Sequence, residues 1–236
     1  MFKNKYLYVI VPHRGVNAGK SRLSAGLNEV ARGKLNRWLL ARTVGVVAQW
    51  LGGAQGAQRC VVVSPCEVTL ALARKAGAVA LAERASTAGL NDALSQAAAH
   101  AASLGAQRLL ILPCDLPRLT VAALEAMEAV PVLGKDVVIA PDRHYAGTNA
   151  LLVDADVREF AFGAGSYEKH LAQANARGAR TVACVHEALA FDLDTADDFA
   201  AWANSDDVPQ DFLASLQRTV QRTVPHAAAT VTSRTK

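Results

Sequence analysis

Three aspartates follow apolar runs, at places where side chains can meet a ligand at the edge of a sheet. Asp115 ends the run "LLILPCD" and lies between two prolines that stiffen its turn. In "FDLD", strand alternation would put Asp192 and Asp194 on one face and the two apolar residues on the other. Because Mg²⁺ bound with phosphates takes only one or two protein carboxylates, Asp115 and an acid of this pair could serve one ion. The spacing does not choose between Asp192 and Asp194.

A loop after the first apolar run carries three cations, Arg14, Lys20 and Arg22. Its stretch "GVNAGKS" differs from the phosphate-binding P-loop, G-x-x-x-x-G-K-[ST], in having three residues between its glycines. A missing residue would break the backbone cradle of a P-loop, and Gly26 follows too soon for the helix that should begin there. Three cations at the end of a strand can instead bind a triphosphate and neutralise a leaving pyrophosphate. A P-loop kinase or ATPase is therefore the weaker interpretation.

A glycine-rich stretch, "FGAGS", offers a second anion site. Ser166 is predicted as the N-cap of a helix, and Gly163 and Gly165 let the backbone approach a ligand closely. Free N–H groups, a hydroxyl and the positive end of the helix dipole together attract an anion. Thr148 could add a second hydroxyl, and Arg143 a charge. No serine lies in a G-x-S-x-G elbow, which argues against a hydrolase.

Together these features favour nucleotidyl transfer to a phosphorylated acceptor. Each alone has a plainer explanation, as a solvated basic loop, a turn cap or a glycine-rich helix start. Combined, they form a triphosphate site and a smaller anion site, with carboxylates suited to Mg²⁺ between them. The phosphate of such an acceptor is already an anion at neutral pH, so positioning and charge neutralisation suffice without a general base. None of the six histidines has metal-ligand spacing, and polar lining is the better interpretation of His13 and His144.

Short apolar runs alternate with helical patterns along the chain. This predicts an α/β fold, a single domain with a mainly parallel, mixed sheet flanked by helices, and a ligand site beyond the carboxyl ends of the strands. The predicted strands are Tyr6–Val11, Arg59–Val63, Arg108–Leu112, Asp136–Ala140, Ala150–Val153, Thr181–Val185 and Ala190–Asp194. The predicted helices are Leu35–Leu51, Val68–Gly77, Leu90–Gly105, Thr120–Val130, one from Ser166 to near Gly178, and one to about Trp202 that opens with a capping box of Thr195 and Asp198.

The predicted organisation is a nucleotidyltransferase domain over residues 1–203 and a polar extension over residues 204–236. One further helix is expected at Val208–Leu216, and the end of the chain is expected to be disordered.

The bulk composition narrows the class of partner. The 236 residues suit one large domain, and 51% hydrophobic residues supply a sizeable core. A net charge of +4 without a basic run does not favour nucleic acid, so an anionic small molecule is expected. No apolar run approaches the roughly 18 residues that span a membrane. Four cysteines without a CxxC pair indicate reduced thiols and a cytoplasmic protein.

The order of motifs resembles one family along most of the chain. The stretches "VPHRGVNAGKSRL", "GLNDAL", "LPCDLPRL", "APDRHYAGTNALL", "FGAGSYEKHL" and "FDLDTADDF" are similar to those of the 2-phospho-L-lactate guanylyltransferase family, from about Tyr6 to Trp202. The resemblance implies a GT-A-like nucleotidyltransferase fold. It also implies Mg²⁺-dependent transfer of GMP from GTP to 2-phospho-L-lactate, phosphoenolpyruvate or 3-phospho-D-glycerate, with release of diphosphate, in coenzyme F-420 biosynthesis. The product would pass to a downstream transferase of that pathway, and a homodimer stays an open alternative.

Carried over position by position, the resemblance assigns roles to the candidate residues. Asp115 and Asp192 become the magnesium ligands, with Asp194 second to Asp192. Lys20 and Arg22 would act in catalysis together with Asp115. The acceptor would be bound by Thr148, Gly163 and Ser166, with Arg143 beside them, and the nucleotide by Arg14, Lys20, Arg22, Ser64, Pro65, Gly89 and Asn91.

The chain departs from the family pattern at a few positions. Arg14 stands where Lys is common, and Arg presents a planar fork in place of a point charge. His13 stands where an aliphatic residue is usual, and "YAGTN" replaces "GTGTN", which leaves the identity of the acceptor open. A related sugar or molybdopterin-cofactor nucleotidyltransferase and an inactive nucleotide-binding regulator are the remaining alternatives.

Overall fold

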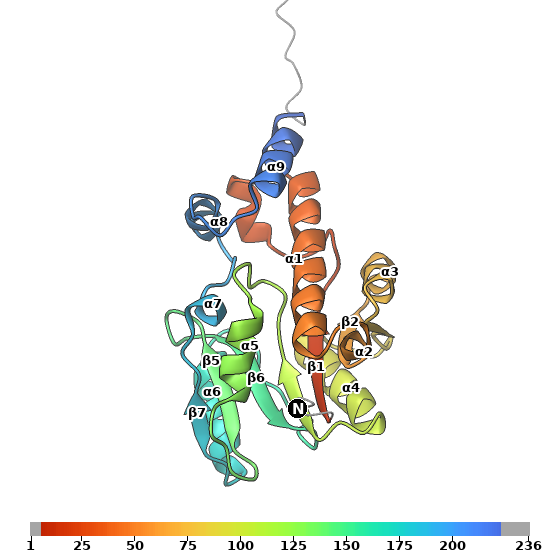
Figure 1. Cartoon of the computed structure of the whole chain (residues 1–236), viewed down its shortest axis with the longest axis vertical. Coiled ribbons are helices and arrows are strands. Elements are labelled where there is room, and N and C mark those ends of the chain that lie inside the picture. Colours follow the sequence, from red (N-terminus) through yellow and green to blue (C-terminus); the bar gives the residue numbers. More distant parts are fainter. Residues whose placement is uncertain (1–5, 223–236) are drawn as a thin grey trace, which may run out of the picture.

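A mixed sheet lies at the centre of the protein (Figure 1). The structure, a computed structural model, describes residues 6–222 of the chain. Within them the strands follow the order β3-β2-β1-β4-β6-β5-β7 across one seven-stranded sheet. Their bounds are β1 Leu7–Pro12, β2 Cys60–Ser64, β3 Val79–Ala82, β4 Arg108–Ile111, β5 Val137–Pro141, β6 Thr148–Asp154 and β7 Thr181–Ala183.

The direction of the strands decides which residues meet at one edge of the sheet. β1, β2, β3 and β4 pair in parallel, so their carboxyl ends share an edge. β6 runs antiparallel to both β4 and β5, with Leu151 opposite Ile111 and Thr148 opposite Pro141. The first residue of β6, Thr148, therefore lies at the edge where β4 and β5 end. We call this the carboxyl edge of the sheet.

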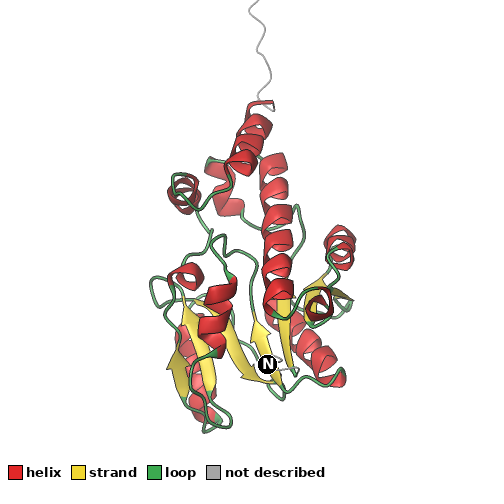
Figure 2. Ribbon diagram, viewed as in Figure 1, coloured by secondary structure: helices red, strands yellow, loops and turns green. Residues whose placement is uncertain are grey.

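Helices cover both faces of the sheet (Figure 2). The α-helices are α1 Glu29–Trp50, α2 Ala54–Ala57, α3 Glu67–Lys75, α4 Leu90–Ser103, α5 Val121–Glu128, α6 Ser166–Ala176, α7 Glu187–Ala190, α8 Ala196–Ala203 and α9 Gln210–Arg222, and a 3-10 helix, η1, spans Ser21–Ala25. Side-chain caps fix several starts. Asn28 accepts the Ala31 N–H at 2.9 Å before α1, and the predicted capping box of Thr195 and Asp198 is present before α8.

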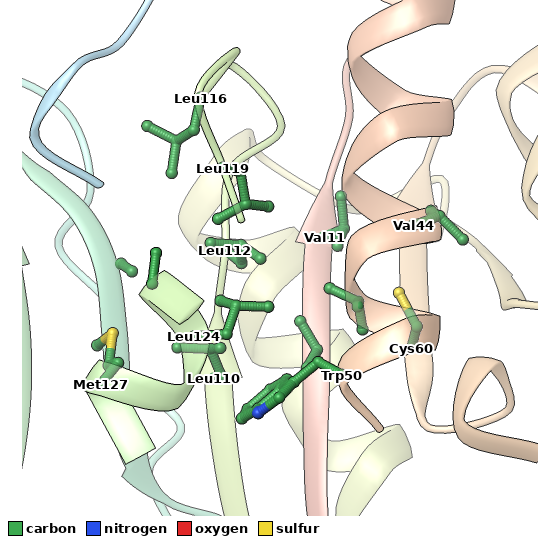
Figure 3. Packing of buried hydrophobic residues seen from close by; sticks show 14 of the residues in the cluster. Val11, Val44, Trp50, Cys60, Leu110, Leu112, Leu116, Leu119, Leu124 and Met127 are labelled. Carbon is green, nitrogen blue, oxygen red and sulfur yellow. The ribbon is translucent and has the colours of Figure 1, made fainter. Parts of the chain in front are cut away.

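Alternation along the buried strands supplies a separate core on each face. Val9 and Val11 of β1 pack in one cluster with residues of α1 and α5, among them Val44, Trp50, Leu124 and Met127 (Figure 3). Ile10 points to the other face and packs in a second cluster with the alanine-rich face of α4 and with Ala174 of α6. Both faces of the central strands are thus covered, which is why their sequences are continuous apolar runs.

A third cluster lies beyond the sheet, around the amino-terminal half of α1 (Figure 1). Here α1 contributes Leu35 and Leu39, which pack with Trp202 of α8 and Leu216 of α9. Trp38 stacks on Phe212 of α9 with ring centroids 4.6 Å apart. The predicted helix Val208–Leu216 is confirmed in α9, which begins two residues later and packs on the domain through apolar contacts. The domain boundary at residue 203 stays a prediction, and the expected disordered end lies largely outside the described residues.

The prediction of a strand at Ala190–Asp194 is wrong. α7 ends at Ala190, and the next residues are extended but pair with no strand within residues 6–222. They cross over the end of β4, where the Leu193 N–H donates to the Asp115 carbonyl at 3.0 Å. The extended backbone still alternates, so Phe191 and Leu193 are buried while the two aspartates between and after them face outward.

One further prediction needs correction, and one strand was not predicted. The N-cap of α6 is Gly165, with φ of 66°, and Ser166 is the first helical residue. The strand β3, "VALA", was not predicted, because its residues are only partly buried at the edge of the sheet and lack a run of β-branched side chains. The four cysteines are free. No helix in residues 6–222 is long and apolar enough to cross a membrane.

The third cluster generates a stability prediction. Leu216 is fully buried against α1, so Leu216→Ala should lower the free energy of unfolding by about 2–5 kcal/mol, measured by urea denaturation with tryptophan fluorescence. Gln217→Ala, at the exposed neighbouring position of α9, should change it by less than about 0.5 kcal/mol. Equal, small losses in both variants would mean that α9 does not stabilise the domain.

Candidate active site at the carboxyl edge

A pocket of about 490 Å³ opens at the carboxyl edge, above the ends of β1, β2 and β4. It combines cationic, acidic and backbone groups from segments that lie far apart in the chain. The predicted site residues among its lining are Arg14, Lys20, Pro65, Gly89, Asp115 and Asp194. The lining also includes His13, Asn36, Glu83 and Cys114, which sequence reasoning did not assign to the nucleotide. Glu83 directly follows β3, a strand that was not predicted, so no sequence pattern placed Glu83 at this edge.

The predicted acids come together. The backbone hydrogen bond from Leu193 to Asp115 brings the neighbours of Leu193 in the chain, Asp192 and Asp194, to the turn that follows β4. Burial, and then the charges of Asp115 and Asp194, raise the pKa of Asp192 to about 6. Burial and Asp115 also raise the pKa of Asp194, while Lys20 and Arg22 oppose that rise. We call Asp115, Asp192 and Asp194 the acid cluster.

The acid cluster has the chemistry of a partial metal site. Its donors are hard carboxylate oxygens, whose mutual repulsion a cation would relieve. Within residues 6–222 no three His, Cys, Asp or Glu side chains are arranged to hold a metal ion by themselves. One or two carboxylates with phosphate oxygens and water are the usual ligands of Mg²⁺ in such sites. The residues therefore fit an ion that arrives with a phosphorylated ligand.

The cationic loop lies against the acid cluster. Lys20 has a left-handed backbone, with φ of 52°, and its Nζ donates to the Leu193 carbonyl at 2.6 Å. Arg14 is exposed at the pocket wall. Arg22 is exposed near Asp194, and its charge opposes the rise in the pKa of Asp194. The loop leads into the short η1 helix and not into the α-helix that follows a P-loop, so the weaker interpretation finds no support in the geometry.

Helix α1 anchors both charged loops. Asn36 Nδ2 donates to the Val16 carbonyl at 3.0 Å and to the Ala18 carbonyl at 3.2 Å, which fixes the cationic loop. Arg42 Nε donates to the Pro117 carbonyl at 2.8 Å, and its Nη2 to the Leu119 carbonyl at 2.8 Å, just after Asp115. One helix thus sets the distance between the cations and the acids.

His13 fastens the start of the cationic loop. Its Nδ1 accepts the Gly15 N–H at 3.1 Å and lies 3.1 Å from the Thr69 hydroxyl. Burial, and then the charge of Lys20, lower the pKa of His13 to about 4. The imidazole is therefore neutral at physiological pH, as a side chain that orders a loop would be.

The predicted acceptor residues also come together, at the start of β6 and α6. The Thr148 N–H donates to Ser166 Oγ at 2.9 Å, and Thr148 Oγ1 lies 2.9 Å from Nδ1 of His170. Thr148 and Ser166 are only 6% and 2% exposed, and neither lines the pocket above β1, β2 and β4. Gly163 is exposed beside them with φ of 118°, a conformation that favours glycine.

Arg143 is held by an acid of α8. It pairs with Asp198, and its guanidinium lies 4.9 Å from the centre of the Phe191 ring. Asp198 also accepts the backbone N–H of Asp194 at 3.1 Å. These contacts connect Arg143 to the segment that carries two members of the acid cluster. Its predicted contact with the acceptor stays a prediction.

Two predicted nucleotide residues have internal partners. Ser64 is fully buried, and its Oγ accepts the Cys66 N–H at 3.1 Å, so it shapes the turn after β2. Asn91 exchanges two hydrogen bonds with the backbone of Phe162, at 3.2 Å and 2.9 Å. Asn91 thereby ties the start of α4, at the pocket, to the glycine-rich loop before α6.

Similarity to solved structures defines the class of fold. A putative nucleotide-diphospho-sugar transferase from Desulfovibrio desulfuricans superposes with a TM-score of 0.64 at 16% identity, over 92% of this chain and 96% of the other. A nucleotidyl transferase from Methanothermobacter superposes with a TM-score of 0.58 at 16% identity, over 90% of this chain and all of the other. The fold is that of the nucleotidyltransferases, as the motifs predicted.

Sequence similarity defines the family. The family model described as "Guanylyl transferase CofC like" matches residues 7–234. A phosphoenolpyruvate guanylyltransferase of Rubrobacter xylanophilus is 40% identical over 82% of this chain and 92% of its own. A 3-phospho-D-glycerate guanylyltransferase of Phenylobacterium zucineum is 34% identical over 80% of this chain and 86% of its own. The chain belongs to the CofC-like guanylyltransferase family, which confirms the predicted resemblance.

The acid cluster generates a pH-dependent prediction. Because folding raises the pKa of Asp192 from 3.8 to about 6, its ionisation destabilises the fold as pH rises through that window. In EDTA, Asp192→Asn should therefore melt at a higher temperature than the wild type at pH 7.5. The difference should shrink as pH falls from 6 towards 4.

Asp197→Asn, at an exposed position in the first turn of α8, is the matched control and should bring no gain. A melting difference for Asp192→Asn that is absent, or constant from pH 4 to pH 7.5, would contradict the raised pKa of Asp192.

Proposed function

We propose that this protein transfers GMP from GTP to a phosphorylated three-carbon acid and releases diphosphate. The observation that carries the proposal is one edge of one sheet that holds a cationic loop, an acid cluster and a pair of hydroxyl groups. Family membership supports guanylyl transfer, and the names of the relatives support phosphoenolpyruvate or 3-phospho-D-glycerate as acceptor. 2-Phospho-L-lactate is the third candidate.

We assign the divalent ion to Asp115 with Asp192 or Asp194. These carboxylates fit Mg²⁺ because they supply hard oxygen donors and repel one another without a cation. When bound, the ion would neutralise negative charge on the phosphate oxygens of GTP. Lys20 lies beside the acid cluster and would stabilise the charge that develops on the leaving diphosphate, together with Arg22 and Arg14.

The chain needs no general base for this reaction. The attacking group is a phosphate oxygen, which is ionised at neutral pH, so catalysis consists of alignment and charge neutralisation. The two buried histidines near the site agree with this view. Burial keeps the pKa of His13 and of His170 near 4, so both rings are neutral. In each ring the nitrogen with the lone pair already accepts a backbone N–H, and the other nitrogen carries the hydrogen, so neither ring is free to take a proton from a substrate.

The pathway and the location belong to the same proposal. A guanylylated three-carbon acid suits a downstream transferase in coenzyme F-420 biosynthesis. The free cysteines support a reducing compartment, which we take to be the cytoplasm.

The exposed Tyr145 is close in sequence to Thr148 and replaces a smaller residue of the family pattern. Its ring packs edge to face on Tyr167, with ring centroids 5.6 Å apart.

The decisive experiment offers purified protein GTP and Mg²⁺ with each of the three acids separately. We expect release of diphosphate with at least one acid, and formation of the guanylylated acid by mass spectrometry. ATP and CTP in place of GTP serve as controls for the nucleotide. Diphosphate release that does not depend on an acid, or no release with any of the three, would contradict the proposal.

Asp115→Asn tests the acid cluster. The variant should keep its fold and lose at least about 100-fold in kcat/KM, because even indirect partners of a metal ion cost 10–100-fold. Magnesium titration of the melting temperature in the presence of GTP should show a weaker rise than for the wild type. Asp206→Asn, at an exposed position after α8, should behave as the wild type. Near-normal turnover by Asp115→Asn would remove Asp115 from this role.

Ser166→Ala tests the acceptor site. A hydrogen bond to a charged group contributes about 1.5–3 kcal/mol, so the KM for the acceptor should rise about tenfold or more while the KM for GTP stays unchanged. The free energy of unfolding should fall by about 1–3 kcal/mol, because the buried Thr148 N–H loses its partner. Ser103→Ala, at the far end of α4, is the control. Equal increases in both KM values would place Ser166 outside the acceptor site.

A further inference from the structure

His170 connects three segments around the predicted acceptor site. It lies on α6 one turn after Ser166 and is only 3% exposed. Its Nε2 accepts the backbone N–H of Ala161 at 3.2 Å, from the loop that precedes the glycines. Its Nδ1 lies 2.9 Å from Thr148 Oγ1 at the start of β6. The ring also packs edge to face on Phe162, with centroids 4.8 Å apart.

These two contacts determine where the imidazole carries its hydrogen. A backbone N–H can only donate, so Nε2 of His170 must offer a lone pair and carries no hydrogen. A neutral imidazole then carries its hydrogen on Nδ1, which donates to Thr148 Oγ1. Burial, and then the charge of Lys169, lower the pKa of His170 to about 4, which agrees with a neutral ring.

The assigned hydrogen leaves both hydroxyls as donors. Thr148 Oγ1 accepts from His170, and Ser166 Oγ accepts from the Thr148 N–H. Within residues 6–222, the structure holds no acceptor for the hydrogen of either hydroxyl in these contacts, so both hydrogens remain for a ligand oxygen. A carboxylate or phosphate takes two such donors well. A phosphorylated acid carries both groups.

We propose that His170 is a positioning residue for the acceptor, which orients the Thr148 hydroxyl as a donor and fixes the glycine-rich loop to β6. This inference rests on the proposed function and deepens it, because it explains how the site selects an anionic acceptor. His170 itself is buried, contacts Thr148 and does not line the pocket at the carboxyl edge, so it would act through Thr148. Its substitution should affect acceptor binding and leave nucleotide binding unchanged.

Two isosteric variants separate the two contacts of His170. In His170→Asn the side-chain NH₂ lies near the former Nδ1, so Thr148 keeps its donor. In His170→Gln the side-chain oxygen lies near the former Nε2, so Ala161 keeps its acceptor and Thr148 loses its donor. We expect His170→Asn to keep the KM for the acceptor within about threefold of the wild type, and His170→Gln to raise it about tenfold or more. The KM for GTP should not change in either variant.

Controls distinguish orientation from a general loss of structure. His100→Asn and His100→Gln, in the last turn of α4, should match the wild type. In a Thr148→Val background, His170→Gln should bring no further rise in the KM for the acceptor, because the hydroxyl it orients is gone. Calorimetric binding of phosphoenolpyruvate and of 3-phospho-D-glycerate, without GTP, should follow the same order and does not require turnover.

Several outcomes would overturn the inference while leaving the proposed function intact. These are equal effects of His170→Asn and His170→Gln on an active enzyme, a parallel rise in the KM for GTP, or a full effect of His170→Gln in the Thr148→Val background. A variant that does not fold is replaced by the Thr148→Val and Thr148→Ser pair, in which only the hydroxyl-bearing variant should keep acceptor binding. A wild type that neither binds nor converts any of the three acids would overturn both proposals.

Discussion

Repulsion among the three carboxylates of the acid cluster is the constraint on which the site depends. A backbone hydrogen bond between Leu193 and Asp115 joins segments far apart in the chain and holds like charges together at the end of β4. The fold accepts this arrangement because Lys20 Nζ donates to the carbonyl of Leu193, next to the acids, and because most of the remaining structure is well packed. Perturbed acids in a pocket are a frequent mark of a functional site, and here their cause is explicit.

The reversed direction of β6 brings Thr148 and the loop before α6 to the edge that carries the acid cluster. In a purely parallel sheet, the residue that begins a strand would lie at the opposite edge from Asp115. Because β6 runs antiparallel to β4, Thr148 lies at the carboxyl edge, and the loop before α6 closes beside it. Asn91 then joins the start of α4 to that loop. The mixed topology is thus a condition for bringing Thr148 and Ser166 to the same edge of the sheet as the acid cluster.

Much of this arrangement could be predicted from sequence because it follows from local rules. Continuous apolar runs indicated β1, β2 and β4, since strands buried on both faces cannot alternate. The alternation of Asp192 and Asp194 with buried apolar residues was predicted correctly, but for a strand that does not exist, because any extended backbone alternates. The short, partly exposed β3 had too weak a pattern, and Glu83 was missed with it. Contacts such as that of Arg42 with Pro117 have no local signal at all.

Helix α1 has a consequence for how the protein can vary. Gly33 lies in its interior, where a β-carbon would come within 2.8 Å of Oδ1 of Asn17, so the Asn17 side chain of the cationic loop would have to shift. Asn36 and Arg42, which hold the two charged loops, are six residues apart, or about 9 Å along the axis at 1.5 Å per residue. The same stretch carries Leu35 and Leu39, against which the carboxyl-terminal helices pack. An insertion or deletion in this stretch would therefore shift and rotate the cationic loop relative to the acid cluster.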